Sequence, residues 1–193
     1  SGAAAGPIEI EVGDGTTGPG SNLKLLSGRS DGGNSGILHL STKDGNSAAP
    51  YSASGMLTLS TGAAYSPGGT SGPIRMGTGT SERGGGGAIE ITVGHGKAGT
   101  GGDITMSAGG TGHSAGKGGS VLVSSGSSAT RPTGNIFIKS PNAGPVVANS
   151  GSITLSTGDV AGGNSGGIYL RSGDSSGAAA GPIEIEVGDG TTG

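Results

Sequence analysis

The chain has 193 residues, of which 48 are Gly and 9 are Pro, and only four are aromatic (three Tyr, one Phe and no Trp). Its formal net charge is −3 with 12% charged residues, and no basic block could neutralise a nucleic-acid backbone. No apolar run approaches the ~18 residues of a membrane span, and the absence of cysteine excludes disulfides and thiolate metal sites. Any ordered core must therefore use aliphatic side chains.

A short repeat runs along the whole chain. It reads aliphatic, any, aliphatic, any, small or Val, usually followed by Gly, and we number its twelve occurrences 1 to 12 in chain order. Their first residues are Ile8, Leu23, Leu38, Leu57, Ile74, Ile89, Ile104, Val121, Ile136, Ile153, Ile168 and Ile183. We call the residue that opens a repeat position 1. Positions 1 and 3 form a first and a second column, which together hold 24 of the chain's 34 Ile, Leu, Val and Met residues.

A second, longer repeat contains the short one. Residues 1–18 return unchanged as residues 176–193, which gives a long repeat of about 175 residues. Successive short repeats begin about 15 to 19 residues apart, and eleven such steps make up the long repeat. We expect residues 1–193 to be a window of a longer tandem array.

Alternation of aliphatic and other residues is the period of a β-strand and not of a helix. The segments between repeats, such as Gly13–Asn22 and Gly158–Ser165, are rich in Gly, Asp, Asn, Ser and Pro, which favour turns. The pattern predicts an all-β fold, a parallel β-solenoid of about twelve rungs of 15–19 residues that runs as one continuous domain over residues 1–193. In it, the two aliphatic columns would face inward.

The positions between the columns vary and carry most of the charge. In stacked rungs, neighbouring repeats would place opposite charges side by side. The expected pairs are Lys24 with Glu9, Arg75 with Glu90, and Arg171 with Glu186. Slipping by one rung would break them together, so we expect these pairs to fix the register.

Several motifs resemble sites, and each has a simpler interpretation. Gly13–Gly18, repeated at Gly188–Gly193, matches a dinucleotide fingerprint but precedes no helical pattern, which favours a turn. Five aspartates stand at position 7 of their repeats, and the last three would stack in one column. The five are Asp14, Asp44, Asp159, Asp174 and Asp189. We expect them to cap turns; a calcium site is the alternative. The histidines (His39, His95 and His113) are too scattered for zinc or for a nucleophile with its base. We expect no enzyme, no catalytic, cofactor-binding or metal site, and no cofactor.

Two binding functions remain as alternatives. An ice-binding face is suggested by Thr58 with Ser60, Thr105 with Ser107, and Thr154 with Ser156, although charged and aromatic residues interrupt that lattice in other repeats. An adhesin stalk would display aromatic side chains, namely Tyr51, Tyr65, Phe137 and Tyr169. The chain has no N-glycosylation sequon, whereas its Ser, Thr and Pro residues leave O-linked glycans open.

Two segments carry a resemblance to known proteins, ASGMLTLSTG (53–62) and NSGSITLSTGDVAGGNSGGIYLRSGD (149–174). They resemble Gly/Ser-rich tandem-repeat proteins of microbial, including algal, extracellular fibres. The resemblance implies a secreted or cell-surface location and a structural role. We therefore expect an extracellular filament in which copies of the chain continue one another head-to-tail, with itself as partner, no nucleic acid and no membrane span.

Overall fold

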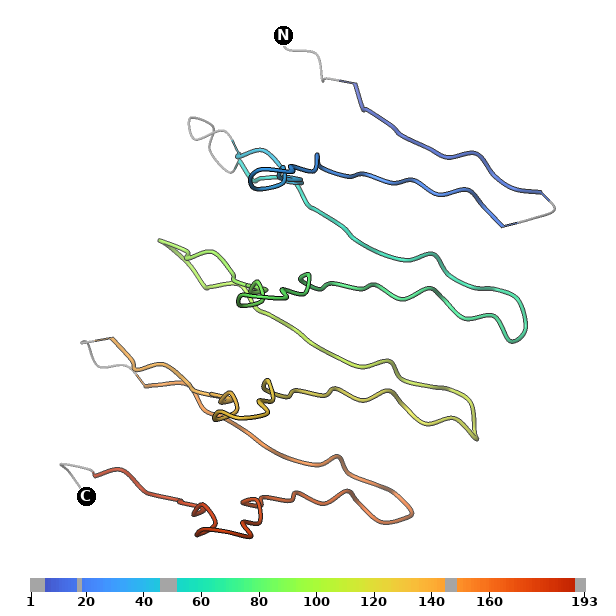
Figure 1. The fold of residues 1–193 in the computed structure, drawn as a ribbon. Helices are drawn as coiled ribbons and strands as arrows, with labels where there is room; N and C mark the ends of the chain where they lie inside the picture. Colours follow the sequence, from blue (N-terminus) through green and yellow to red (C-terminus); the bar gives the residue numbers. More distant parts are fainter. Residues whose placement is uncertain (1–5, 17–18, 46–51, 145–148, 190–193) are drawn as a thin grey trace. The chain divides into compact units, whose positions relative to one another are not determined.

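The computed structural model describes residues 6–16, 19–45, 52–144 and 149–189 (Figure 1). Its contacts divide the chain into two units, Ser1–Thr92 and Val93–Gly193. Each unit contains about six short repeats and is described by itself. A single domain over residues 1–193 stays a prediction.

The β-solenoid prediction is wrong. The described residues form no helix and no β-strand, and the chain runs as extended coil interrupted by bends and turns. Five backbone–backbone hydrogen bonds lie within the described part, and all five join residues three to ten positions apart. A parallel sheet would instead bond each repeat to the next one along the chain, at a separation of about a whole coil. Alternation in the sequence thus produces extended segments without producing a sheet.

The solvent-exposed surface shows why no core forms. The chain exposes 19414 Å², whereas a compact protein of 17.9 kDa exposes about 8000 Å². No residue is buried in the described part of the chain. Each repeat supplies two column side chains for about 15 residues, and burying two aliphatic groups offsets only ~3 to 6 kcal/mol of a larger ordering cost.

Successive repeats are nevertheless joined in one recurrent way. Eleven of the twelve repeats have Gly two residues before position 1, the exception being Ser21. A Cβ built on nine of these glycines would lie within 4 Å of position 5 of the preceding repeat, as at Gly87 beside Thr78 and at Gly119 beside Ala108. We call this approach the closing contact. The others are Gly36 with Ser27, Gly55 with Thr42, Gly72 with Thr61, Gly102 with Val93, Gly134 with Ser125, Gly151 with Ser140, and Gly166 with Thr157.

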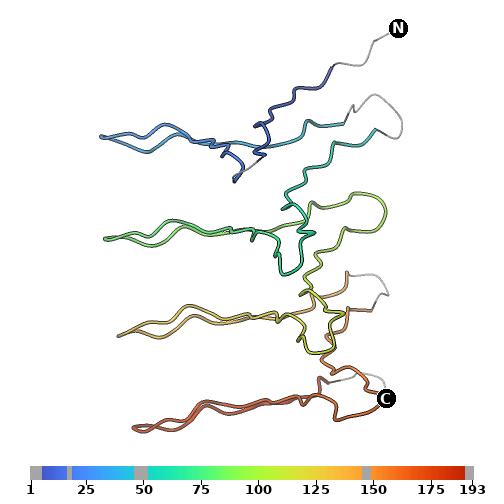
Figure 2. The same cartoon turned by 90° about the vertical axis from the view of Figure 1, so that its right-hand side faces the viewer.

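Backbone hydrogen bonds accompany several closing contacts. Gly36 N donates to Gly28 O (2.8 Å), Gly119 N to Gly109 O (2.9 Å), and Gly134 N to Gly126 O (3.0 Å). After repeat 5, the Thr78 hydroxyl donates to Gly87 O instead (3.2 Å). These bonds close the base of a loop, and in Figure 2 the arms leading to such loops run side by side as narrow excursions of the chain.

Every third connection contains a serine at the same place. We call the ten-residue segments 27–36, 78–87, 125–134 and 172–181, which follow repeats 2, 5, 8 and 11, the serine loops. Each has Ser at position 8 of its repeat, and no other repeat does. In three of them this hydroxyl accepts a hydrogen bond from the amide three residues later: Gly84 N to Ser81 (3.0 Å), Arg131 N to Ser128 (3.0 Å) and Ala178 N to Ser175 (3.1 Å). Such bonds are typical of Ser in turns.

Removing the serine hydroxyl tests this loop. Ser128→Ala deletes the acceptor for Arg131 N, so we expect the amide of Arg131 to exchange with solvent about two- to tenfold faster. Ser127→Ala, one residue away, is the matched control and leaves that rate unchanged. Amide hydrogen exchange measured by NMR gives both rates, and equal acceleration in the two variants would contradict the described loop.

Candidate self-association surface

The aliphatic columns remain the most regular feature of the surface. From repeat 2 to repeat 12, every first-column side chain is 50–58% exposed, although the residues differ between Leu, Ile and Val. Second-column side chains are more exposed, at 57–87%. About half of each first-column side chain is therefore left for a partner to cover, in repeat after repeat.

Side chains between the columns lie on the opposite side. Leu122, between Val121 and Val123, is 88% exposed, whereas the two valines are 58% and 62% exposed. Phe137 and Tyr169, which occupy the same position as Leu122 in their repeats, are exposed to a similar degree. Extended backbone places successive side chains on opposite sides, and the side of the columns is the one that neighbouring repeats partly cover.

Partial coverage of the columns comes from neighbouring repeats. The first repeat, the only one with no repeat before it among the described residues, leaves Ile8 93% exposed, whereas Ile183, in the same sequence, is 53% exposed. At position 5 the order is reversed: Val12 is 37% exposed and Val187 is 95% exposed. A preceding repeat thus covers position 1, and a following repeat covers position 5, as the closing contact of Gly102 with Val93 illustrates.

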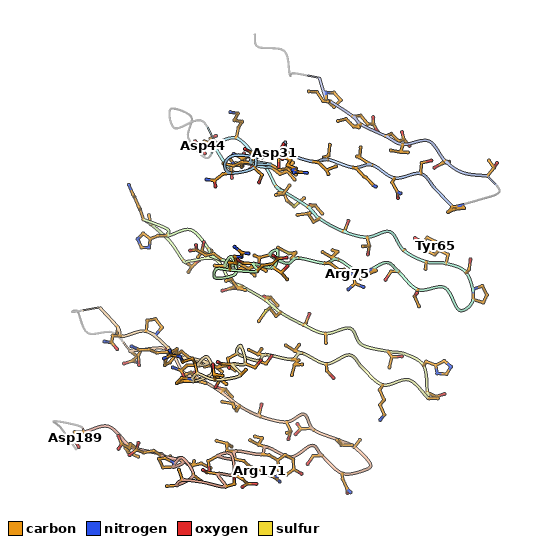
Figure 3. All side chains as sticks on the ribbon, in the orientation of Figure 1. Asp31, Asp44, Tyr65, Arg75, Arg171 and Asp189 are labelled. Carbon is orange, nitrogen blue, oxygen red and sulfur yellow. The ribbon has the colours of Figure 1, made fainter. Side chains whose placement is uncertain are left out.

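The predicted ion pairs are not found. None of Lys24–Glu9, Arg75–Glu90 and Arg171–Glu186 forms a salt bridge within the described residues. The one ion pair in this part joins Arg29 and Asp31 (2.5 Å) inside a serine loop, with both side chains exposed. Arg171 lies over the ring of Tyr169 within its own repeat, 5.8 Å from the centroid. Without stacked strands, charges of neighbouring repeats are not held opposite each other; Figure 3 shows Arg75 and Arg171 on their extended segments.

The residues of the candidate metal and nucleotide sites are not brought together in the described part of the chain. Over the part of the chain that the structure describes, no group of three His or acidic residues could hold a metal ion, so Asp159, Asp174 and Asp189 do not form one. The described residues also contain no pocket. Both fingerprint-like runs lie partly outside the described residues; where Gly13–Thr16 is described, it is extended coil ending in a bend.

The histidines and aromatic residues occupy separate local settings. His113 shapes a turn: its backbone oxygen accepts from Gly116 N (3.0 Å), and its Nδ1 accepts from Ala115 N (3.2 Å). Tyr65 is almost fully exposed (Figure 3), and Tyr51 lies outside the described residues. The Thr-x-Ser pairs expected on an ice-binding face lie on coil, because the described residues contain no sheet to hold them flat.

Two further regularities of the sequence mark contacts that the structure contains. One is the glycine two residues before nearly every repeat, where a side chain would press on the previous repeat. The other is Ser at position 8 in every third repeat. Both can be found by aligning the twelve repeats on position 1, and both mark contacts that the structure contains.

Comparisons with known proteins add no further information. No family model, curated protein or solved structure matches the chain. No helix among the described residues is long and apolar enough to cross a membrane. What recurs in the described residues is a pair of partly exposed aliphatic side chains in each repeat.

The closing contact has a direct test. A Cβ at residue 102 would lie 3.0 Å from Val93 Cγ1, whereas one at residue 101 meets nothing within 4 Å. We expect Gly102→Ala to shift the methyl resonances of Val93 in NMR spectra, since the side chain must move to make room. Gly101→Ala is the matched control and should leave these resonances in place. Unchanged Val93 methyl signals in both variants would contradict the contact.

Proposed function

We propose that this chain is a structural, non-catalytic protein of extracellular filaments, secreted or held at the cell surface, in which the partner is another copy of the same chain. The observation that carries the proposal is the first column, which is half exposed in eleven consecutive repeats. Soluble monomers rarely expose large continuous apolar patches, and such patches mark association surfaces. Continuation through the solenoid geometry expected from the sequence is not part of the proposal.

Area supports a large contact between chains. The exposed surface exceeds that of a compact protein of equal mass by roughly 11000 Å², several times the total area of a standard protein–protein interface. Many chains can therefore surround each chain. Covering the columns would also lower the cost of ordering the extended segments, which one chain does not offset alone.

The repeats themselves favour a copy of the same chain as partner. Every repeat offers the same pair of aliphatic side chains, so any two chains have matching surfaces at many relative shifts. A net charge of only −3 over 193 residues leaves little repulsion between chains. Filaments follow where each chain contacts others at surfaces that repeat along its length.

A location outside the cell follows the resemblance of residues 53–62 and 149–174 to Gly/Ser-rich tandem-repeat proteins. O-linked glycans on the Ser- and Thr-rich connections would be compatible with it, since they leave the columns uncovered. Mass spectrometry of material from the native source would detect them.

Column substitutions test self-association. Replacing Val121 and Val123 together by Asp removes two half-covered apolar groups. We expect the concentration for half-maximal assembly to rise by about 10- to 150-fold, which corresponds to ~1.5 to 3 kcal/mol. Sedimentation velocity over a concentration series measures this value, and electron microscopy shows whether the assemblies are filaments.

Leu122→Asp is the matched control, because it adds a charge to the same repeat on the opposite side of the chain. We expect assembly of this variant to stay within about threefold of the wild type, since an exposed charge contributes less than ~1 kcal/mol. A wild-type chain that stays monomeric at every concentration would refute the proposed function.

A further inference from the structure

The residue types at positions 2 and 4, on the side of each repeat opposite the columns, recur at every third repeat over part of the chain. Positions 2 and 4 are Thr and Ser in repeats 4, 7 and 10 alone, and we call these the hydroxyl repeats. Of the nine other repeats, seven carry Lys, Arg or Glu at these positions, while repeat 3 has His39 and repeat 8 has Leu122. The serine loops follow repeats 2, 5, 8 and 11, so both features recur every third repeat, except that repeat 1, three before repeat 4, carries Glu9 and Glu11.

The hydroxyls of the hydroxyl repeats have no partner within the described residues. They belong to Thr58, Ser60, Thr105, Ser107, Thr154 and Ser156, all of which are exposed. Some hydroxyls elsewhere are bonded within the chain: Ser81 and Ser128 accept from amides, and Thr78 donates to a carbonyl oxygen. Other exposed hydroxyls, such as those of Ser41 and Ser124, stand at position 4 without a hydroxyl at position 2, so only the hydroxyl repeats pair Thr with Ser on this side.

Charge limits which repeats can meet the identical repeat of a second chain on this side. Bringing two like-charged repeats together costs free energy, and so does removing a charge from water without a partner. Thr and Ser hydroxyls both donate and accept hydrogen bonds, so identical hydroxyl repeats are complementary to each other. Cross-strand Thr–Thr and Thr–Ser pairs stabilise extended chains by roughly 0.2–1 kcal/mol each.

We infer that each of the hydroxyl repeats, at Thr58–Ser60, Thr105–Ser107 and Thr154–Ser156, forms a second contact between copies of this chain, on the side of its own repeat opposite the aliphatic side chains. This inference rests on the proposed function and adds to it. The columns supply the apolar contact between copies. On the opposite side of a repeat, a second copy contacts the chain at the hydroxyl repeats. Charged repeats remain in contact with water.

Lysine substitutions at position 2 test the inference on the full chain. The test variant combines Thr58→Lys, Thr105→Lys and Thr154→Lys. The control combines His39→Lys, Leu122→Lys and Phe137→Lys, at the same position of repeats 3, 8 and 9. Both sets raise the formal net charge from −3 to 0 at position 2 of three repeats, so charge and position are matched while the replaced side chains differ.

We expect the concentration for half-maximal assembly to rise by roughly tenfold in the test variant, because three sites place like charges opposite each other. The control should change it by less than about threefold, and raising the salt concentration should reduce the defect of the test variant. Replacing the three threonines by serine should leave assembly as in the wild type.

Other outcomes separate the two proposals. If the column aspartates block assembly but the test variant assembles like the wild type, the hydroxyl surface is refuted and the proposed function stands. If the control is impaired more than the test variant, side-chain hydrophobicity and not the hydroxyl position governs this side, which also refutes the inference. If the wild-type chain does not assemble, both proposals fail.

Discussion

The structure depends on how little apolar surface each short repeat contributes. Two column side chains for about 15 residues do not offset the ordering of the backbone, and the low aromatic content removes the usual source of additional burial. The described chain accordingly stays extended and exposed, with its order confined to loops. Further burial of these side chains would require surfaces outside the single chain, which is the role that the proposed function gives to other copies.

Alternation was a sound guide to local conformation and a poor guide to fold. Leu122 lies away from Val121 and Val123, as a period of two requires, yet no ladder connects Ile89 to Ile104 in the described residues. Periodicity indicates which side of an extended chain a residue faces. Pairing of neighbouring repeats into a sheet depends instead on whether burial and hydrogen bonds offset the cost of ordering all ~15 residues of a repeat. The three expected ion pairs failed for the same reason, since they required neighbouring repeats to be stacked.

Parts of the candidate surface were nevertheless present in the sequence. The two columns were identified from the spacing of residues such as Ile104 and Met106, and they form the surface that the proposed function uses. The closing glycines and the serine at position 8 needed a comparison among all twelve repeats, because any single Gly or Ser in such a chain carries little information. The different exposures of Ile8 and Ile183 could not be predicted from their identical local sequences, because they depend on whether a described repeat precedes them.

The serine loops have a consequence for how such an array changes in length. All four repeats that are followed by a serine loop lie at the same spacing from the next repeat, while the spacing between the other repeats varies. Differences in spacing thus lie only at the other connections, where loop-closure entropy rises slowly with length. The two repeats that flank a serine loop therefore keep one separation along the chain, which makes them a unit of fixed length within an array of variable spacing.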